Sequence, residues 1–364
     1  MEKSKAKRAG RGGWRAAACA VALAIPWGCA ERASEGPASP GAKPVLRIYT
    51  WSDYVKPELI QRFERENHCA VVIDTYDSNE AMYDHLNARD KGPFDLLFPS
   101  SYMVKILHDQ DRLRKLNPAW IPNLRNIDPA YLAMAFDKEM DHSAPYAMGI
   151  TCLGYRGSQV KGFAPSWGML DRADLAGRMS MLDDHRETIG AALKFLGYSL
   201  NSTNDQELAQ AKAVVLRWKK NLAGFDNEQY EENLAAGASL VVHGYGGDLM
   251  QAQLEDPDIQ IAVPQEGAAL SFDDMVIPAD AAQVELAHAF INFILDPHVA
   301  AELTESICFL CPNEVSYQYL SAETRANPIL LPPPEMAEKL EMIADLGAST
   351  AKYEKLWQEI QDRP

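Results

Sequence analysis

The sequence predicts an α/β protein of two lobes, and three observations lead to that prediction. The chain has 364 residues, more than one compact core usually holds. From Val45 onward, short apolar runs alternate with segments of helical periodicity, which is typical of a parallel sheet covered by helices. A second alternating block begins near Ile150, so we expect a ligand cleft between two lobes.

The first 28 residues have the layout of an export signal. Six basic residues precede an alanine-rich apolar run, 16–26, that is too short to span a bilayer. Gly28-Cys29 then resembles the end of a bacterial lipobox. Residues 29–44 are rich in Ser, Pro, Gly and Ala, which predicts a flexible tether if Cys29 is lipidated. Release of a soluble periplasmic protein is the alternative, and both interpretations predict export.

The charge balance is strongly acidic, with a formal net charge of −16. Because the signal region is basic, the chain that follows it is more acidic still. A protein of this charge repels nucleic acid and anionic lipid and attracts polycations. The composition therefore excludes nucleic acid as a partner and is compatible with a cationic one.

Four of the six cysteines follow the signal region: Cys69, Cys152, Cys308 and Cys311. In an exported protein the spacing Cys308-Phe-Leu-Cys311 is compatible with a local disulfide. A redox motif is disfavoured because no thioredoxin-like strand and helix flank the pair. Cys69 and Cys152 stand alone and give no second pair for a metal site, so we expect no metal and no cofactor.

The first block predicts strand, helix, strand, helix and strand. We expect strands at 45–50, 70–75 and 94–98, with a helix that starts at Pro57 and a second helix that ends at Leu86. Ligands of parallel sheets bind beyond the carboxyl ends of the strands. Three clusters of polar and aromatic residues fall at these ends: 51–54, 76–79 and 100–102.

The second block has the same alternation. Strands at 177–182 and 239–243 each lead into a polar stretch and a helix, and strands at 259–263 and 273–278 return the chain to the first block, followed by a helix at 283–295. We expect the chain to cross between the lobes near 148–150 and 271–274. The glycines of 244–247 predict a turn with positive φ, with Asp248 as the cap of the next helix.

Aromatic and acidic residues gather at the predicted strand ends. Aromatic faces favour a cation and pack along methylenes, and carboxylates accept charge-assisted hydrogen bonds from ammonium groups. Together they predict a site for an elongated, flexible alkyl amine. Arg186 is the one basic residue in these clusters, which argues against phosphate or sulfate. The aromatic set is Trp51, Tyr54, Tyr102 and Tyr245; the acidic set is Asp53, Asp184, Glu187, Asp248 and Asp273.

Several of these residues also have a purely structural interpretation. Trp51 and Tyr54 could pack in the core, and Asp184 could be a helix cap with a favourable dipole. Arg186 could form a surface ion pair, and Asp273 or Asp274 could be a solvated strand end. His185 and His243 read as satisfied junction residues because no partner stands at metal-ligand spacing.

Blocks of sequence in the order YTWSDYVKPELIQRFEREN, YDSNEAMYDHL, FDLLFPSSYMV and VPQEGAALSFDDMVIPADA resemble those of the periplasmic spermidine/putrescine-binding proteins of polyamine ABC importers. The resemblance runs over nearly all of the chain after the signal. It implies a class II periplasmic binding-protein fold, with residues 45–149 plus 273–317 in lobe 1 and residues 150–272 plus 318–364 in lobe 2. It also implies a monomer that captures putrescine or spermidine and delivers it to permease subunits in the inner membrane, without catalysis.

Carried over residue by residue, the resemblance implies a ligand cage and some departures from it. Tyr245 stands where the family commonly has Trp, and Phe309 where it has Tyr. Ser271 replaces a large aromatic, and Ile343 stands where a spermidine-type member has Gln, so the preferred polyamine stays open. The implied cage comprises Trp51, Ser52, Asp53, Tyr54, Ser100, Tyr102, Asp184, Glu187, Tyr245, Asp248, Asp273 and Phe309.

Three other functions share some of these features. A quaternary amine or cationic amino acid would need aromatic rings and only one carboxylate, so the excess of acids favours a polyamine. A glycoside hydrolase would need one acid with a raised pKa, and neither Asp184 nor Glu187 has an apolar sequence context that predicts this. A receptor that senses amines instead of feeding a transporter has the same sequence features.

Overall fold

The computed structural model describes residues 43–88 and 93–363. The predicted signal peptide, Cys29 and all but the last two residues of the predicted tether lie outside these residues. Residues 43–364 fall into one compact unit. The boundaries proposed for the two lobes therefore stay a prediction. No helix in the described ranges is long and apolar enough to cross a membrane.

The first block has the predicted alternation of strands and helices. Strand β1 pairs in parallel with β2 on one side and with β3 on the other. Leu59 and Phe63 of the first helix are buried, and Pro57 occupies its first turn, where the missing N–H costs nothing. The third strand is shorter than predicted. The elements are β1 (Val45–Trp51), α1 (Pro57–Asn67), β2 (Ala70–Tyr76), α2 (Asn79–Ala88), β3 (Leu96–Leu97) and α3 (Ser101–Asp109).

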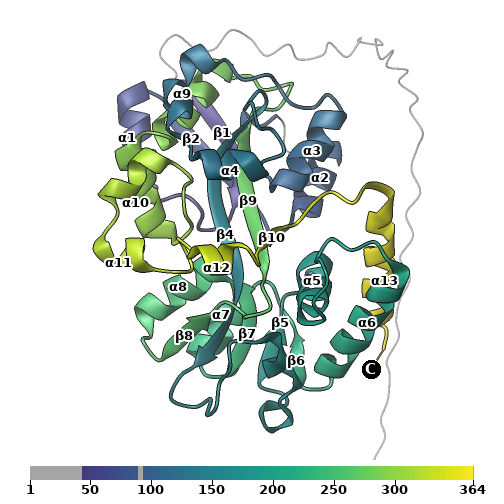
Figure 1. Ribbon diagram of the computed structural model, residues 1–364. Helices are drawn as coiled ribbons and strands as arrows, with labels where there is room; N and C mark the ends of the chain where they lie inside the picture. Colours follow the sequence, from purple (N-terminus) through teal and green to yellow (C-terminus); the bar gives the residue numbers. More distant parts are fainter. Residues whose placement is uncertain (1–42, 89–92, 364) are drawn as a thin grey trace, which may run out of the picture. The chain divides into compact units, whose positions relative to one another are not determined.

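Two long strands, β4 (Ser143–Arg156) and β9 (Ala269–Val276), connect the two blocks. They pair antiparallel from Ser143 opposite Val276 to Ile150 opposite Leu270. The predicted crossing points lie inside this ladder. In Figure 1 the two strands run side by side from the elements around β1 and β2 to those around β5 and β7. Strand β9 starts earlier than predicted and includes Ser271.

The second block continues the sheet in the order β4, β7, β5, β6, with β8 on the free part of β4. Strand β5 is parallel to β6 and β7, whereas β7 and β8 are antiparallel to β4. The elements are β5 (Met179–Met181), α5 (His185–Phe195), α6 (Asp205–Lys219), β6 (Leu222–Phe225), α7 (Tyr230–Ala235), β7 (Val241–Tyr245), α8 (Gly246–Glu255) and β8 (Ile259–Ala262).

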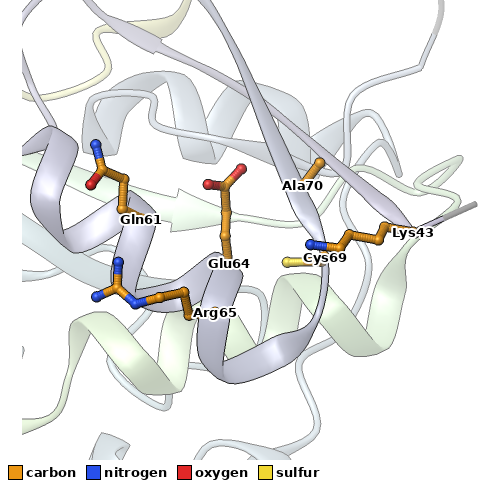
Figure 2. A pocket seen from close by; sticks show the side chains of 6 residues that line it. All are labelled: Lys43, Gln61, Glu64, Arg65, Cys69 and Ala70. Carbon is orange, nitrogen blue, oxygen red and sulfur yellow. The ribbon is translucent and has the colours of Figure 1, made fainter.

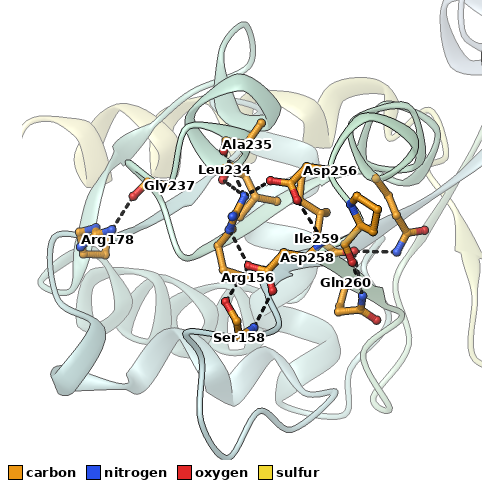
Figure 3. Close-up of polar contacts among 12 residues, drawn as sticks. Arg156, Ser158, Arg178, Leu234, Ala235, Gly237, Asp256, Asp258, Ile259 and Gln260 are labelled. Atoms are coloured by element: carbon orange, nitrogen blue, oxygen red, sulfur yellow. Dashed lines mark hydrogen bonds and ion pairs between the residues drawn. The ribbon is translucent and has the colours of Figure 1, made fainter.

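A partly buried arginine fixes the far end of β4 to the segment between α8 and β8. Arg156 pairs with Asp256 and, through Nε, with Asp258 at 3.0 Å, and it also donates to the Ala235 carbonyl at 3.0 Å (Figure 3). Asp258 accepts from the backbone N–H of Ser158 at 2.7 Å. Every charge in this cluster has a partner within the protein, so the cluster serves the fold.

The remaining elements pack on the outside of the sheet. Phe63 of α1 meets Phe290 of α9 edge to face, with 4.9 Å between the ring centroids. Near the C-terminus, β10 pairs in parallel with β9, and the last helix packs on α5 and α6. The elements are α4 (Pro129–Met134), α9 (Val284–Ile294), α10 (Pro297–Ile307), α11 (Ala322–Ala326), α12 (Pro334–Ala337), β10 (Glu341–Met342) and α13 (Thr350–Gln361).

Candidate ligand-binding site

The stretch Trp51 to Tyr54 ends β1 at the carboxyl edge of the sheet. Trp51 Nε1 donates to the Phe98 carbonyl at 2.9 Å, and its ring packs on Tyr76 with 4.6 Å between centroids. Asp53 has a left-handed φ of 51°, which Asp tolerates better than most residues, and it stays exposed. The turn therefore fixes an aromatic ring beside a solvent-facing carboxylate.

The carboxylate of Asp273 joins three segments. Its Oδ2 accepts from the Tyr54 hydroxyl at 2.6 Å, and its Oδ1 accepts from the Ser100 hydroxyl at 2.7 Å. Asn79 of α2 donates in turn to Ser100 Oγ at 3.0 Å. Burial raises the pKa of Asp273 to about 6, although these hydrogen bonds oppose the rise. Both oxygens are thus satisfied inside the protein.

Asp274, the next residue of β9, points into the core instead. Its Oδ2 accepts from Ser101 at 2.6 Å and its Oδ1 from Tyr131 at 2.7 Å. Only 4% of Asp274 is exposed, so the interpretation as a solvated strand end is wrong for this residue. Alternation along the strand separates the two acids.

Asp184 and Glu187 open helix α5. Asp184 caps the helix, because its Oδ1 accepts from the backbone N–H of Arg186 at 2.7 Å and of Glu187 at 3.1 Å. The cap interpretation is confirmed, and it uses one oxygen of the carboxylate. Glu187 is 3% exposed, and its Oε2 has no hydrogen-bond partner among the described residues.

Glu187 has the most perturbed acid pKa of the candidate site. Burial first, and then the charge of Asp184, raises this pKa to about 8. The prediction from sequence context that neither acid has a raised pKa is therefore wrong for Glu187. The sequence hid this because groups that lie close to Glu187, such as His243 and Tyr245 of β7, are distant along the chain.

Arg186 does not neutralise these acids through an ion pair. Its guanidinium donates to the Ala344 carbonyl at 2.8 Å and to Asn201 Oδ1 at 2.7 Å, and it lies over the Tyr353 ring at 4.9 Å. Arg186 is 8% exposed, so the interpretation as a surface ion pair is wrong. Two of its nitrogens, Nη1 and Nη2, fix Ala344 and Asn201 to α5, and its Nε has no hydrogen-bond partner among the described residues.

Asp248 lies in the first turn of α8 and is held by a tyrosine. The Tyr230 hydroxyl donates to Asp248 Oδ2 at 2.6 Å and accepts from the Tyr245 backbone N–H at 3.2 Å. Burial raises the pKa of Asp248 to about 6, and the charge of Asp53 adds to the rise. Asp248 is not the helix cap that the sequence predicted, because α8 already begins at Gly246.

The glycines before Asp248 provide room, not positive φ. None of the three has φ in the left-handed region. A Cβ on Gly244 would lie 2.2 Å from the Tyr230 ring, and a Cβ on Gly247 would lie 2.1 Å from the Phe309 ring. The predicted positive-φ turn is therefore wrong. These positions need glycine because two aromatic rings of the candidate site occupy the space of a side chain.

Electrostatic interactions link tyrosine hydroxyls and acids that come from the first and the second sequence block. The pKa of the Tyr102 hydroxyl is raised well above its ordinary value by burial, then by Glu80, to which it donates at 3.1 Å, and then by Asp184. Burial followed by Asp184, Glu187 and Asp248 raises the pKa of Tyr245 in the same way. Acids and aromatic rings that are distant in sequence therefore lie together.

Phe309 closes one side of this group. Its ring meets Tyr54 edge to face, with 5.5 Å between centroids, and it fills the space over Gly149 and Gly247. Ser271 lies opposite Gly149 in the ladder and donates to its carbonyl at 3.3 Å. Ser52 is exposed and joins none of the contacts recorded for the described residues.

The structure shows no sign of metal or disulfide chemistry in its described part. Cys69, Cys152, Cys308 and Cys311 are all free and buried. No group of three or more His, Cys, Asp or Glu side chains in residues 43–88 and 93–363 is arranged to hold a metal ion. His243 is not the satisfied histidine that the sequence predicted, because neither ring nitrogen has a described hydrogen-bond partner.

A surface pocket of about 310 Å³ lies elsewhere, at the amino ends of β1 and β2 (Figure 2). Its carboxylate, Glu64, already accepts from the Val71 backbone N–H at 2.8 Å. Ligands of parallel sheets bind beyond the carboxyl ends of the strands, which is the other side of the sheet from this pocket. The pocket is therefore separate from the acid and aromatic group. It is lined by Lys43, Gln61, Glu64, Arg65, Cys69 and Ala70.

The strand arrangement is that of a periplasmic-type solute-binding protein. The chain belongs to the bacterial extracellular solute-binding protein family, whose model matches residues 58–332. It is 32% identical over 317 residues to the spermidine/putrescine-binding periplasmic protein of Escherichia coli, covering 87% of this chain and 91% of that protein. It is 33% identical over 342 residues to the putrescine/cadaverine-binding protein of Pseudomonas aeruginosa, covering 90% and 96%.

A solved structure shares the fold. The spermidine/putrescine ABC transporter substrate-binding protein from Streptococcus pneumoniae superposes with a TM-score of 0.79 at 29% identity, and the match covers 88% of this chain and 99% of that one. The predicted α/β binding-protein fold is thereby confirmed. The family and these relatives are binding proteins of transporters, and the relatives from Escherichia coli and Pseudomonas aeruginosa are named for polyamine binding.

Sequence reasoning missed residues that position the acids. Tyr230 orients Asp248, and Asn79 orients Ser100, which donates to Asp273. Asn79 lies in the cluster after the second strand, which was a usable signal. Tyr230 opens a six-residue helix with no periodic pattern, so no local signal identified it.

Proposed function

We propose that this protein captures a polyamine such as putrescine or spermidine outside the cytoplasm and delivers it to the permease of an ABC importer. The ligand cage would comprise the twelve residues named from the sequence, with Asp53, Asp248 and Asp273 at primary ammonium ends and Asp184 and Glu187 at another amine. Trp51, Tyr54, Tyr102 and Tyr245 would line the methylenes. The protein would act in the periplasm as a monomer without catalysis.

The carrying observation is a group of desolvated carboxyl groups that no basic side chain of the described residues pairs with. The pKa values of Asp248 and Asp273 are raised to about 6 and that of Glu187 to about 8, each chiefly by burial. No Lys or Arg in the described ranges forms an ion pair with any acid of the cage. A ligand with two or more ammonium groups would supply the missing positive charge.

A single carboxylate would suffice for a quaternary amine or a cationic amino acid. The number of buried acids supports the polyamine over these. A glycoside hydrolase gains support from the raised pKa of Glu187. It needs acids on both sides of a sugar, however, and Asp184 and Glu187 both belong to the start of α5.

Calorimetric titration tests this proposal. Putrescine and spermidine are added to purified protein that has been freed of copurified ligand, and to Asp184→Asn and Asp248→Asn. We expect binding in the micromolar range, about −8 kcal/mol, and a loss of tenfold or more in each variant.

Asp183→Asn is the matched control. Asp183 precedes Asp184 but is exposed, and its Oδ1 accepts from Gln361. Removing the same charge there should leave the dissociation constant within about twofold, because exposed charges interact weakly. If the control and Asp184→Asn lose affinity equally, the polyamine is attracted by the overall negative charge of the protein and not by specific contacts in a cage. No heat with either amine in folded protein would overturn the polyamine assignment, and quaternary amines and cationic amino acids would be titrated next.

A further inference from the structure

A fully buried histidine lies directly behind Glu187. His243 of β7 has its Nε2 3.9 Å from Glu187 Oε2. Neither that oxygen nor either ring nitrogen of His243 has a hydrogen-bond partner among the described residues. A separation of 3.9 Å is too long for a hydrogen bond. Buried polar atoms are nearly always paired, so two adjacent unpaired ones indicate a contact that is completed in another state of the protein.

The other side of the His243 ring is fixed by packing. The ring meets Trp167 edge to face, with 4.8 Å between centroids, and Trp167 Nε1 donates to the Gly267 carbonyl at 2.9 Å. Burial lowers the pKa of His243 to about 3, so the imidazole is neutral and carries one N–H. A neutral imidazole is able to donate one hydrogen bond without adding charge to the site.

Several other groups face Glu187, and none of them takes the place of His243. Asp184 raises the pKa of Glu187, whereas Thr151 and Arg186 lower it. Two Arg186 nitrogens, Nη1 and Nη2, donate to Ala344 and Asn201, and its Nε has no hydrogen-bond partner among the described residues. Glu187 in turn raises the pKa of Cys152 and Tyr245. The titratable or polar groups around Glu187 are therefore Asp184 and Arg186 of α5, Thr151 and Cys152 of β4, and His243 and Tyr245 of β7.

We propose that His243 is a positioning residue for Glu187 when the site holds a ligand ammonium group. The inference rests on the proposed function, since it needs a cationic ligand. When the ligand ammonium group binds, the Glu187 carboxyl loses its proton to solvent. The Nε2–H of His243 then donates to Oε2 and turns the other carboxylate oxygen toward the ligand. The hydrogen bond needs a shift of about 1 Å, the difference between 3.9 Å and an ordinary N···O distance.

The test compares variants that keep or remove the donor. His243→Phe keeps an edge-to-face partner for Trp167 but has no N–H. His243→Gln places an amide N–H where the imidazole Nε2 lies. Both are made in the wild-type and Glu187→Gln backgrounds, and putrescine affinity is measured by calorimetry near neutral pH. Ser180→Ala is the control, because the Ser180 hydroxyl of β5 is also buried and unpaired but belongs to no part of the site.

We expect His243→Phe to weaken putrescine binding by about tenfold, the effect of one hydrogen bond to a charged group. His243→Gln should recover most of this loss, and Ser180→Ala should bind like the wild type. In the Glu187→Gln background the phenylalanine change should have little further effect. Wild-type affinity in His243→Phe, or the same loss in both backgrounds, overturns the proposal.

A second readout needs no ligand. The Glu187 carboxyl carbon is titrated by NMR in the free protein. Raising the pH ionises Glu187 without a ligand and should draw the same hydrogen bond from His243, so loss of this donor should raise the pKa of Glu187 further. If no amine binds even the wild type, the proposed function fails, and this titration alone decides the pairing. An unchanged titration in His243→Phe overturns it. Should that variant not fold, His243→Asn replaces it, because its amide is too short to reach Glu187.

Discussion

Asp273 and Glu187 are both acids of the candidate site, yet the protein treats the two carboxylates differently. Asp273 has both oxygens bonded to hydroxyl groups, from Tyr54 and Ser100. Glu187 has an oxygen without any described partner and a histidine just out of reach. Burial raises the pKa of both acids, to about 6 and about 8 respectively. The larger rise belongs to the acid with fewer hydrogen bonds.

The site has two ends: one at Asp273 on β9 and one at Glu187 on α5. The difference between them shows which end is complete without a ligand. A buried carboxylate with its hydrogen bonds satisfied contributes to the fold, whereas one left unpaired costs free energy until something pairs with it. The β9 end of the site is therefore preorganised. The α5 end depends on what enters the site, and mutations at the two ends should have opposite effects on the free protein.

The largest effect on stability is expected at the preorganised end. Asp273→Ala removes the acceptor of the buried Tyr54 hydroxyl and should lower the free energy of unfolding by about 2 kcal/mol. Urea denaturation near pH 5 measures it, below the raised pKa of Asp273, because ionisation of this acid at neutral pH would offset part of the loss. Adding Tyr54→Phe to the same protein should cost less than the two single changes together, because the orphaned hydroxyl is gone. Strict additivity would show that the Tyr54–Asp273 hydrogen bond does not contribute to the fold.

The opposite effect is expected at the other end. Glu187 has a raised pKa in the folded protein, so it binds its proton more tightly when folded than when unfolded. The stability that this gives is present at low pH and is lost as the pH rises through about 8. Glu187→Gln should therefore unfold with a higher free energy than the wild type in alkaline buffer, by about 1.4 kcal/mol for each unit of pKa shift.

Urea denaturation of both proteins near pH 6 and near pH 9 checks this. The gain in the free energy of unfolding of Glu187→Gln over the wild type should be larger at the higher pH. The matched control is Glu338→Gln, which removes the same charge from the exposed segment after α12. A control that changes stability as much as Glu187→Gln would indicate a general charge effect, and a less stable Glu187→Gln at the higher pH would contradict the contrast with Asp273.

Much of this site follows from the order of strands in the sequence. Trp51 and Tyr102 come after apolar runs whose carboxyl ends meet at one edge of a parallel sheet, and this local pattern predicted their grouping. Asp184 was identifiable in the same way, as a polar residue between a strand and a helix. These residues depend on local periodicity, which one sequence displays.

The partners of the acids were not predictable, because they depend on packing between distant segments. Tyr230 reaches Asp248 only because Gly244 leaves room for its ring. The burial of Glu187 and its approach to His243 arise from the alignment of α5 with β7, which no local pattern encodes. The chemistry of the site was therefore visible from the sequence, but the pKa values of its acids were not.

A smaller change is expected where a single hydroxyl orients an acid. Tyr230→Phe removes the hydrogen bond to Asp248 but keeps the ring against Gly244. It should destabilise the protein by about 1 kcal/mol, and it should raise the pKa of Asp248 further, because that hydrogen bond lowers it. NMR titration of the Asp248 carboxyl carbon measures the pKa shift. A downward shift would mean that the hydroxyl does not stabilise the ionised acid.

The smallest expected signal is the number of protons released when a polyamine binds. It also compares the Glu187 end of the site with the Asp273 end. A polyamine that binds ionised carboxylates should displace protons between about pH 6 and pH 8, chiefly from Glu187, whose pKa in the free protein is the higher. Calorimetry in buffers of different ionisation enthalpy should show release of a fraction of a proton near neutral pH, with affinity falling as the pH is lowered.

The two ends are separated by substitution. Glu187→Gln should abolish most of the proton release near neutral pH, whereas Asp273→Asn should leave it in place and remove only the part that appears nearer pH 6. Asp273 would then act as a fixed anion over the neutral range, with Glu187 as the acid that ionises when the ligand arrives. Equal proton release in both variants and the wild type would place the titrating group elsewhere and remove the distinction between the two ends.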